Sequence, residues 1–335
     1  MTEQPTDLPV PSPAEAKDRL EQALFEIRRV IAGQDDMLER VLVCLLAQGH
    51  LLIEGVPGLA KTLTIKTTAG VLGGSFSRVQ FTPDLVPSDL VGTRIYRPGE
   101  GAFETELGPV FCNFLLADEI NRAPAKVQSA LLEVMQERQV TIGHTSYPVP
   151  DPFLVMATQN PIESEGTYPL PEAQVDRFML KVLIGYPEHD EELTIVQRQL
   201  EDAPELREAL TLDELKALQE TVRQVYVDPS LISYAVDVAT ATRQPVETLR
   251  DYVAYGVSPR GPISLVQAAR ALAVVRGRDY ALVEDVQALT KDALRHRLVL
   301  TYQALAEGVT ADSILESVLA TVPLPQLDLG RMSAA

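Results

Sequence analysis

The sequence predicts an α/β protein in which a core with a parallel β-sheet is followed by a second, all-helical domain. Three observations lead to this fold. The segment 51–54 is typical of a short buried strand, and a glycine-containing loop joins it directly to a helix. Two further apolar runs, 114–117 and 153–157, end in polar residues, as central strands buried on both faces do. Beyond Gly185-Tyr186-Pro187 only helical patterns remain.

The composition leaves room for two packed domains. The chain has 335 residues, enough for two domains of ordinary size. No apolar run approaches the length of a transmembrane helix, and residues 1–10 lack the basic and then apolar regions of a signal peptide. Cys44 and Cys112 lie among apolar residues, so we expect buried free thiols, and the histidines are too far apart to suggest a metal site. We therefore expect a cytoplasmic protein without a membrane span.

The net charge of −18 argues against nucleic acid as a partner. A surface of this charge repels phosphate backbones unless basic residues are locally segregated. The sequence contains no dense block of Lys and Arg, although a ring pore could concentrate a few of them. A nucleic-acid translocase is therefore disfavoured.

The first elements precede the strand at 51–54. Residues 1–11 are rich in proline and small polar residues, and we expect them to be disordered. Ser12-Pro13-Ala14-Glu15 is typical of a capping box with proline at the first helical position. A helix then continues to about Ile31, and a second helix is predicted over about 35–48.

The loop after the strand at 51–54 has the pattern of a phosphate-binding loop, in its required setting between a strand and a helix. Gly55 and Gly58 let the backbone curl, so that successive N–H groups point into one concavity where phosphate oxygens bind. Lys61 is expected to reach the β- and γ-phosphates of ATP, and the Thr62 hydroxyl to ligate Mg²⁺. The predicted ATP-binding residues here are Gly55, Val56, Pro57, Gly58, Leu59, Ala60, Lys61, Thr62 and Leu63.

Two features near this loop leave alternatives open. Ala60 stands where a glycine usually precedes the lysine; alanine tolerates helical φ/ψ angles, so the loop can form if position 60 begins the helix. The motif alone is also compatible with an ordinary glycine turn before a helix. Upstream, the segment 30–34 is either part of an adenine pocket, with Gly33 and Gln34 binding the nucleotide, or a plain helix–helix turn.

The middle of the chain supplies the remaining strands. Residues 78–81 should form a strand, and 82–109 is too long for a plain loop, so it should carry its own small structure. A helix over 125–138 leads into a predicted β-hairpin that turns at Gly143. A short helix at 173–178 precedes the last strand, 179–184. The helices expected beyond it span about 188–199, 212–225, 229–243, 262–276, 283–297 and 311–320, followed by a loose tail at 322–335.

Polar residues at the strand ends form the candidate active site, because parallel sheets bind ligands outside the carboxyl ends of their strands. Asp118 would hold Mg²⁺ opposite the loop threonine, and Glu119 would act as general base toward the attacking water. Asn160 would bind that water or the γ-phosphate, and Arg177 would stabilise charge on the transferring phosphoryl group. The alternatives are a solvated helix N-cap for Asp118-Glu119, a turn residue for Asn160 and a salt bridge with Asp176 for Arg177.

Several longer motifs resemble the MoxR family of AAA+ ATPases. They are GVPGLAKT, LLADEINRAP, SALLEVMQERQVTI, ATQNPIESEGTYPLPEAQVDRF and GVSPRGP. The resemblance covers about residues 14–320 and is most specific over 51–184. This family's phosphate loop typically ends in Ala-Lys-Thr, so Ala60 supports the assignment. Two positions differ from the family, namely the segment 103–107, in a region expected to contact substrate, and Gly261, where alanine is common.

The resemblance implies the architecture in more detail. It implies an AAA+ core at 12–185 with a five-stranded parallel sheet in the order 5-1-4-3-2, and a helical lid at 188–321. It also implies an insert at about 93–106 and a hairpin at about 139–148, whose residues 141–147 should face a ring pore or a partner.

The resemblance also implies how the active site is assembled. Members usually form homo-oligomeric rings, commonly hexamers, with ATP and Mg²⁺ at each subunit boundary. Asn160 would be the sensor-1 residue, and Arg177 an arginine finger acting on the neighbouring subunit's ATP. Arg260 matches sensor 2, and whether it contacts its own or the neighbour's ATP is left open. Arg122 would line the boundary.

The leading interpretation is an ATP-driven machine that remodels, matures or activates partner protein complexes, often together with a von Willebrand factor A domain protein. The alternatives are the motor subunit of a magnesium or cobalt chelatase, a nucleotide-regulated scaffold that barely hydrolyses ATP, and a helicase. The presence of Glu119 and Arg177 argues against the scaffold, and the net charge argues against the helicase. The sequence does not name the substrate.

Overall fold

The central element is a five-stranded parallel sheet with the strand order β2-β5-β8-β1-β9. The structure is a computed structural model and describes residues 8–99, 101–161, 166–200 and 204–325. Numbered along the chain within this sheet, the strands read 5-1-4-3-2 from the β9 edge, which confirms the expected order. The strands are β1 (Leu51–Gly55), β2 (Phe76–Gln80), β5 (Phe114–Asp118), β8 (Leu154–Gln159) and β9 (Leu180–Ile184).

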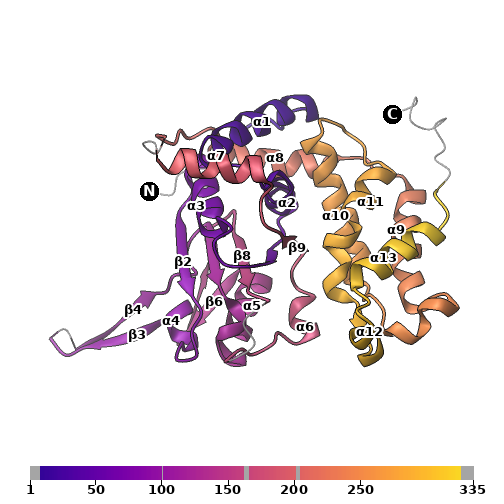
Figure 1. Cartoon of the computed structure of the whole chain (residues 1–335). Helices are drawn as coiled ribbons and strands as arrows, with labels where there is room; N and C mark the ends of the chain where they lie inside the picture. Colours follow the sequence, from indigo (N-terminus) through magenta and orange to yellow (C-terminus); the bar gives the residue numbers. More distant parts are fainter. Residues whose placement is uncertain (1–7, 100, 162–165, 201–203, 326–335) are drawn as a thin grey trace.

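The two faces of this sheet carry separate hydrophobic clusters. Leu51 and Ile53 belong to the larger cluster and Leu52 to the smaller one, because successive side chains of a strand point to opposite faces. Among the helices of the core, one set contributes buried residues to the larger cluster and another set to the smaller one, and Figure 1 shows these helices around the sheet. The first set is α1 (Pro13–Val30), α2 (Asp35–Leu46) and α3 (Lys61–Val71), and the second is α4 (Pro87–Val91) and α5 (Ala125–Glu137).

The N-terminal helix begins as the sequence predicts. The Ser12 hydroxyl accepts from the Glu15 N–H at 3.4 Å, and the Glu15 carboxylate accepts from the Ser12 N–H at 2.8 Å, so the capping box is confirmed. The expectation that residues 1–11 are disordered is wrong at the last of these residues. Pro11 is buried, and its carbonyl accepts from the Thr221 hydroxyl at 2.8 Å. Residues 1–7 lie outside the described residues.

Two β-hairpins extend from the core and touch each other. As expected, 82–109 carries its own structure, which is α4 followed by the antiparallel pair β3 (Gly92–Arg97) and β4 (Ala102–Leu107). The predicted hairpin turning at Gly143 is confirmed as β6 (Gln139–Ile142) and β7 (Thr145–Pro148). The Tyr147 hydroxyl donates to the Thr105 hydroxyl at 3.2 Å. The β3–β4 hairpin projects from the body of the molecule (Figure 1).

The helical part contains more than helices. The expectation that only helices follow the sheet is wrong, because β10 (Val253–Tyr255) pairs antiparallel with β11 (Val299–Leu300). Val253 and Leu300 are partly buried against the larger hydrophobic cluster, so packing brings these short segments together. The helices are α7 (His189–Gln199), α8 (Leu212–Gln224), α9 (Pro229–Arg243), α10 (Arg260–Val275), α11 (Val283–Leu294), α12 (Tyr302–Glu307) and α13 (Ala311–Thr321). Short turns are η1 (Ile120–Arg122), α6 (Glu172–Val175), η2 (Glu247–Tyr252) and η3 (Arg295–Arg297).

The hydrophobic core does not break at the predicted boundary near residue 185. The larger cluster continues from the sheet into α9, α10 and α11, and the Gln219 amide of α8 donates to the Leu45 carbonyl of α2 at 2.8 Å. Val322 is buried, so the tail expected over 322–335 begins later, and 326–335 lie outside the described residues. Within the described part of the chain, no helix is both long and apolar enough to cross a membrane.

Candidate active site

The phosphate loop connects β1 to α3 at the carboxyl edge of the sheet. Gly58 has a φ of 88°, which favours glycine, and α3 begins at Lys61. The Lys61 ammonium donates to the Gly55 carbonyl at 2.7 Å, so the side chain lies across its own loop. Burial lowers the pKa of Lys61, while the nearby carboxylates of Asp118 and Glu119 oppose that shift.

Ala60 does not adopt the conformation that we predicted. It has φ 54° and ψ 15°, in the left-handed region, and the right-handed helix starts one residue later. The loop therefore forms around an alanine in a backbone conformation that a Cβ atom makes unfavourable. This requirement for positive φ explains why a glycine is the usual residue directly before the lysine.

Asp118 ends β5 and is held by two neighbouring strands. The Thr158 hydroxyl of β8 donates to Asp118 Oδ1 at 2.7 Å and accepts from the Glu119 N–H at 2.8 Å. The Arg78 guanidinium of β2 pairs with Asp118 Oδ2 at 2.7 Å. Sequence reasoning assigned no role to Thr158 or Arg78, whose placement depends on which strands become neighbours.

Glu119 lies just beyond β5 with a φ of 55°. Its carboxylate accepts from the Gln80 amide at 2.6 Å and pairs with Arg122 at 3.2 Å. Gln80 stands two residues after Arg78 on β2, so both side chains point to the same face and each holds one acidic residue. The alternation of Arg78-Val79-Gln80 at the end of a strand is the signal from which these two partners could have been found.

Asn160 follows β8 directly and is buried, with 6% of its surface exposed. Because β8 lies between β1 and β5, Asn160 emerges between the phosphate loop and Asp118. The sheet thus brings the predicted residues Lys61, Asp118 and Asn160 to one edge. Thr62 is half-buried in the first turn of α3.

A cavity of about 490 Å³ lies beside the phosphate loop. It is lined by 30–32 and Gln34, by loop residues from Pro57 to Ala60, by Leu63, and by residues of α7. Gly33 does not line it; a Cβ at this position would meet the Glu191 carboxylate at 2.7 Å. The placement of 30–34 next to the phosphate loop favours the adenine pocket over the plain turn.

The residues present fit Mg²⁺ and a nucleoside triphosphate. A hydroxyl (Thr62) and a carboxylate (Asp118) are the oxygen ligands that Mg²⁺ uses, and this ion usually completes its coordination with water and phosphate oxygens. Among the described residues, no group of three or more His, Cys, Asp or Glu side chains could hold a metal by itself.

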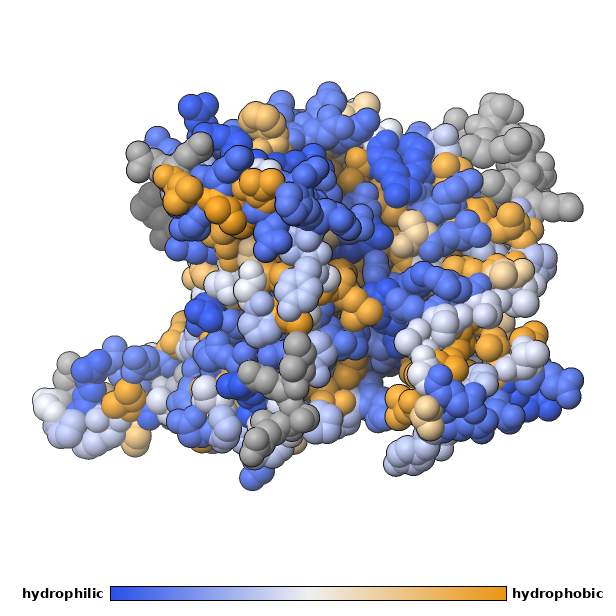
Figure 2. Space-filling view, viewed as in Figure 1, coloured by the Kyte–Doolittle hydropathy of each residue, from blue (hydrophilic) through white to orange (hydrophobic). Residues whose placement is uncertain are grey.

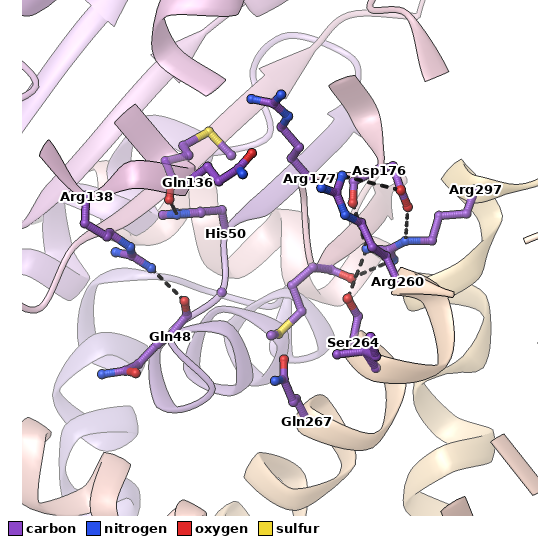
Figure 3. Close-up of a pocket in the computed structure, with 14 residues that line it drawn as sticks. Gln48, His50, Gln136, Arg138, Asp176, Arg177, Arg260, Ser264, Gln267 and Arg297 are labelled. Atoms are coloured by element: carbon purple, nitrogen blue, oxygen red, sulfur yellow. Dashed lines mark hydrogen bonds and ion pairs between the residues drawn. The ribbon is translucent and has the colours of Figure 1, made fainter. Parts of the chain in front are cut away.

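Arg177 and Arg260 lie at the opposite, amino edge of the sheet. They line a second cavity, of about 340 Å³, together with Gln48 and His50, which precede β1, and Arg138, which precedes β6. Figure 3 shows Arg138 on one side of this cavity and Arg260 and Arg297 on the other. Because β1 spans five residues, roughly 15 Å of strand separate this cavity from the phosphate loop.

The salt bridge that we weighed as the alternative role of Arg177 is made by other residues. Asp176 pairs with Arg297 at 2.7 Å and with Arg260 at 3.7 Å, and its two oxygens accept from the Ser258 hydroxyl at 3.2 and 3.1 Å. Arg177 itself is exposed at the rim of the cavity. In this arrangement neither Arg177 nor Arg260 lies beside the phosphate loop of its own chain.

The fold and the site define an ATPase core with a helical lid. Residues 50–180 match the family model of ATPases associated with various cellular activities (AAA), and residues 248–318 match the model of the AAA lid domain. A crystal structure of a candidate ATPase from Cytophaga hutchinsonii superposes with a TM-score of 0.89 at 45% identity, over 94% of this chain and 97% of that one.

Comparison with curated proteins narrows this class to one family. Chaperone MoxR1 of Mycobacterium tuberculosis is 56% identical over 92% of this chain and 83% of its own length. A magnesium-chelatase subunit of Arabidopsis thaliana chloroplasts is more distant, at 27% identity over 68% of this chain and 52% of its own. The chain belongs to the MoxR family of AAA+ ATPases.

Proposed function

We propose that the chain is a Mg²⁺-dependent ATPase that assembles into a ring, most simply a hexamer, in which two subunits complete each ATP site. One observation carries this proposal: Arg177 and Arg260 gather at the amino edge of the sheet, whereas the phosphate loop lies at the carboxyl edge. A head-to-tail contact that closes by rotation brings one edge of a subunit to the other edge of its neighbour.

The carboxyl edge would bind the nucleotide and its metal. The loop N–H groups and Lys61 would hold the phosphates, and Thr62 and Asp118 would hold Mg²⁺, which supplies charge neutralisation at the β- and γ-phosphates. Asn160 would position the attacking water. Glu119 would accept a proton from that water while the water oxygen bonds to the γ-phosphorus and the bond between the γ-phosphorus and the ADP oxygen breaks.

The amino edge would complete the neighbour's site. Arg177 is exposed at the cavity rim, where a guanidinium can reach a phosphate of another subunit. Arg260 is half-exposed in the same cavity, and its weak pairing with Asp176 at 3.7 Å leaves it able to reorient. We therefore assign Arg260, like Arg177, to the neighbour's ATP.

ATP hydrolysis would drive the remodelling of a partner protein complex. Two features support this part of the proposal: the relative at 56% identity carries the name chaperone, and the β3–β4 hairpin exposes large apolar side chains. Ile95, Tyr96 and Phe103 are 42, 52 and 59% exposed, and apolar residues are visible on this projection in Figure 2. A von Willebrand factor A domain protein as partner and a cytoplasmic location stay predictions.

Mixed oligomers test the shared site. Arg177→Ala should bind ATP and turn it over poorly, and Lys61→Ala should not bind ATP but still carry Arg177. When the two inactive proteins are mixed, some boundaries pair an intact Lys61 with an intact Arg177, and ATPase activity should return. If native mass spectrometry shows that they co-assemble and no activity returns, the shared site is wrong.

The hairpins are tested separately from the chemistry. Deleting residues 141–147 should leave basal ATPase within about twofold of the parent, because β6–β7 lies away from the phosphate loop. Stimulation by a partner protein should be lost. A deletion that mainly abolishes nucleotide binding would contradict the proposed role of this hairpin.

A further inference from the structure

Three consecutive residues of the helical lid form hydrogen bonds to the core segment that carries Arg177. Arg295, His296 and Arg297 form η3, and we call them the clasp. Their side chains donate to the backbone carbonyls of four residues of the core, which are Asp176, Phe178, Met179 and Lys181. These carbonyls flank Arg177 and continue into the first residues of β9.

Arg297 makes the densest set of contacts in the clasp. Its side chain is 2% exposed, and its guanidinium donates to the Asp176 carboxylate at 2.7 Å and to the Phe178 carbonyl at 2.8 Å. It also donates to the Asp176 carbonyl at 3.1 Å, the Met179 carbonyl at 3.2 Å and the Ser264 hydroxyl at 3.0 Å, and to the Ala293 carbonyl. A planar guanidinium with five N–H donors suits this task, and a lysine ammonium does not.

His296 adds a contact whose proton can be placed. Its Nε2 lies 3.1 Å from the Phe178 carbonyl, and a carbonyl only accepts, so Nε2 carries the proton. Burial lowers the pKa of His296 well below its ordinary value, and the neighbouring Arg297 lowers it further. The ring is therefore neutral and donates steadily to the core.

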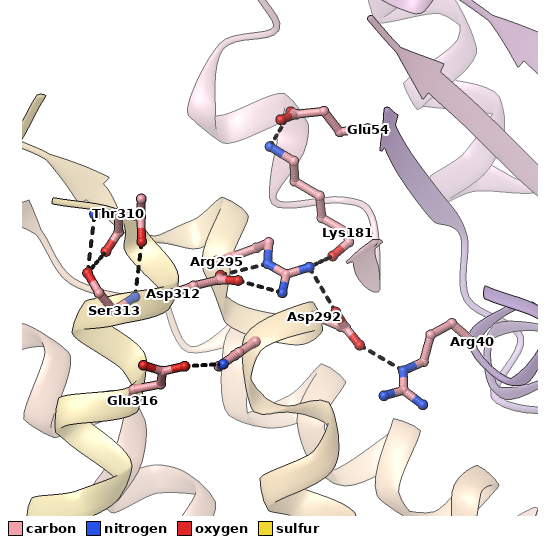
Figure 4. A network of polar contacts seen from close by, with 10 residues as sticks. Arg40, Glu54, Lys181, Asp292, Arg295, Thr310, Asp312, Ser313 and Glu316 are labelled. Atoms are coloured by element: carbon pink, nitrogen blue, oxygen red, sulfur yellow. Dashed lines mark hydrogen bonds and ion pairs between the residues drawn. The ribbon is translucent and has the colours of Figure 1, made fainter. Parts of the chain in front are cut away.

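Arg295 ties the clasp to both parts of the molecule. It donates to the Lys181 carbonyl at 2.8 Å and pairs with Asp292 and Asp312 at 2.8 Å each, as Figure 4 shows. Asp292 in turn pairs with Arg40 of α2 at 2.7 Å. The clasp is thus braced against a core helix on one side and against α13 of the lid on the other.

We propose that the clasp positions Arg177, with Arg297 as the main positioning residue, so that the lid of one subunit sets the turnover of ATP bound by its neighbour. This inference rests on the proposed function, in which Arg177 acts on the neighbouring subunit. The Arg177 side chain is exposed at the rim of the cavity. The backbone of Arg177 is held by the Arg297 contacts to the carbonyls of Asp176 and Phe178 on both sides of it, together with the hydrogen bond from the Arg177 N–H to the Gln174 carbonyl at 3.2 Å.

The inference predicts an asymmetry that a merely structural role lacks. A change in the clasp should harm the subunit that supplies Arg177, and spare the subunit that supplies the phosphate loop. Mixed oligomers separate the two, because each inactive parent keeps only one of these roles. The reference pair is Lys61→Ala mixed with Arg177→Ala.

The test adds Arg297→Lys to one member of this pair at a time. In the first mixture, Lys61→Ala/Arg297→Lys supplies Arg177 to the ATP bound by Arg177→Ala. The recovered ATPase activity should fall by about tenfold or more, because a misplaced arginine finger loses much of its effect on the rate. With Arg177→Ala/Arg297→Lys as the ATP-binding subunit, recovery should stay within about twofold of the reference pair. Equal losses in both mixtures, or no loss in either, would overturn the inference.

Two further variants guard against a folding artefact. Arg278→Met removes one of the two arginines that pair with buried Asp285 inside the lid, at the end of α11 opposite to η3, and should give equal recovery in both mixtures. If Arg297→Lys proves unstable, Ser264→Ala takes its place. This variant removes a single acceptor of Arg297 and should show the same asymmetry in a milder form. Failure of the reference pair itself would refute the shared site, and the clasp inference with it.

Discussion

The carboxyl edge of the central sheet is built from short contiguous motifs, whereas the amino edge is assembled from distant segments. At the carboxyl edge, Asp118 ends a strand, and the phosphate loop, Glu119 and Asn160 each follow a strand directly. At the amino edge, arginines from a helix end, a turn before β9, α10 and η3 meet around one cavity. The first edge depends on local geometry. The second depends on how the lid packs on the sheet.

The two edges also differ in charge. At the carboxyl edge the acidic side chains have basic or amide partners, which are Arg78 for Asp118 and Gln80 with Arg122 for Glu119. The amino-edge cavity contains four arginines and one carboxylate, that of Asp176. In a chain of net charge −18, this local excess of positive charge suits a polyphosphate from another subunit.

The largest expected effect separates binding from turnover at the two edges. Arg177→Ala should lower kcat by about 10³-fold, the scale of an arginine finger, and leave ATP affinity nearly unchanged. The physical reason is that an arginine finger stabilises the charge that develops on the transferring phosphoryl group, whereas Lys61 and the loop bind the phosphates before reaction. Fluorescent-nucleotide titration and steady-state ATPase measure the two quantities. As a matched control, Lys61→Ala should lose ATP affinity instead. An Arg177→Ala protein that lost as much ATP affinity as Lys61→Ala would contradict the separation of binding from turnover.

A smaller loss is expected within the carboxyl edge. Glu119→Gln should lower kcat by about 10²-fold or more and keep ATP binding, because the amide has the same shape and cannot take up the water's proton. Single-turnover assays on prebound ATP give the chemical step directly. A wild-type rate in this variant would refute Glu119 as the general base.

The amino edge should also respond to acid. Burial lowers the pKa of His50 to about 3, helped by nearby Arg138. The neutral ring donates to the Met135 carbonyl and accepts from the Val155 N–H at 3.0 Å. The unfolded chain binds a proton near pH 6.5 and the folded chain does not. His50 therefore favours folding above pH 6.5, and this contribution is lost as the pH falls toward 3.

The size of that loss is up to about 1.4 kcal/mol per pH unit for one histidine. Urea unfolding at several pH values between 4 and 7 measures it. His50→Gln should reduce the slope of unfolding free energy against pH, whereas His189→Gln, at an 86% exposed histidine, should not. An unchanged slope in His50→Gln would show that other groups carry the acid sensitivity.

The same contrast explains what could be read from the sequence. The phosphate loop and the hairpin at Gly143 follow from local patterns, and the strand order follows from the family resemblance; each is present. The left-handed conformation of Ala60 was missed because alanine rarely adopts it, so the residue type pointed to a right-handed helix. The pair β10–β11 and the clasp were missed because their partners lie far apart in the chain and meet only through tertiary packing.

The smallest expected effect concerns the balance of charge at the carboxyl edge. Arg78 pairs with Asp118 Oδ2 at 2.7 Å, on the carboxylate proposed to hold Mg²⁺. The Arg78 side chain is 48% exposed, so solvent screens the pair and its free energy is at most about 1 kcal/mol. Mg²⁺ must compete with this guanidinium for one oxygen, and Thr158 already donates to the other at 2.7 Å.

Arg78→Gln should therefore lower the free Mg²⁺ concentration that gives half-maximal ATPase, by up to about fivefold. The measurement is ATPase activity against free Mg²⁺ at saturating ATP. Arg97→Gln is the matched control, because Arg97 pairs with Glu104 on the projecting hairpin and is also exposed. It should leave the Mg²⁺ dependence unchanged. If Arg78→Gln raised the Mg²⁺ requirement, the guanidinium would be holding Asp118 in its ligand position, and the carboxyl edge would depend on its counter-ions for geometry as the amino edge depends on the clasp.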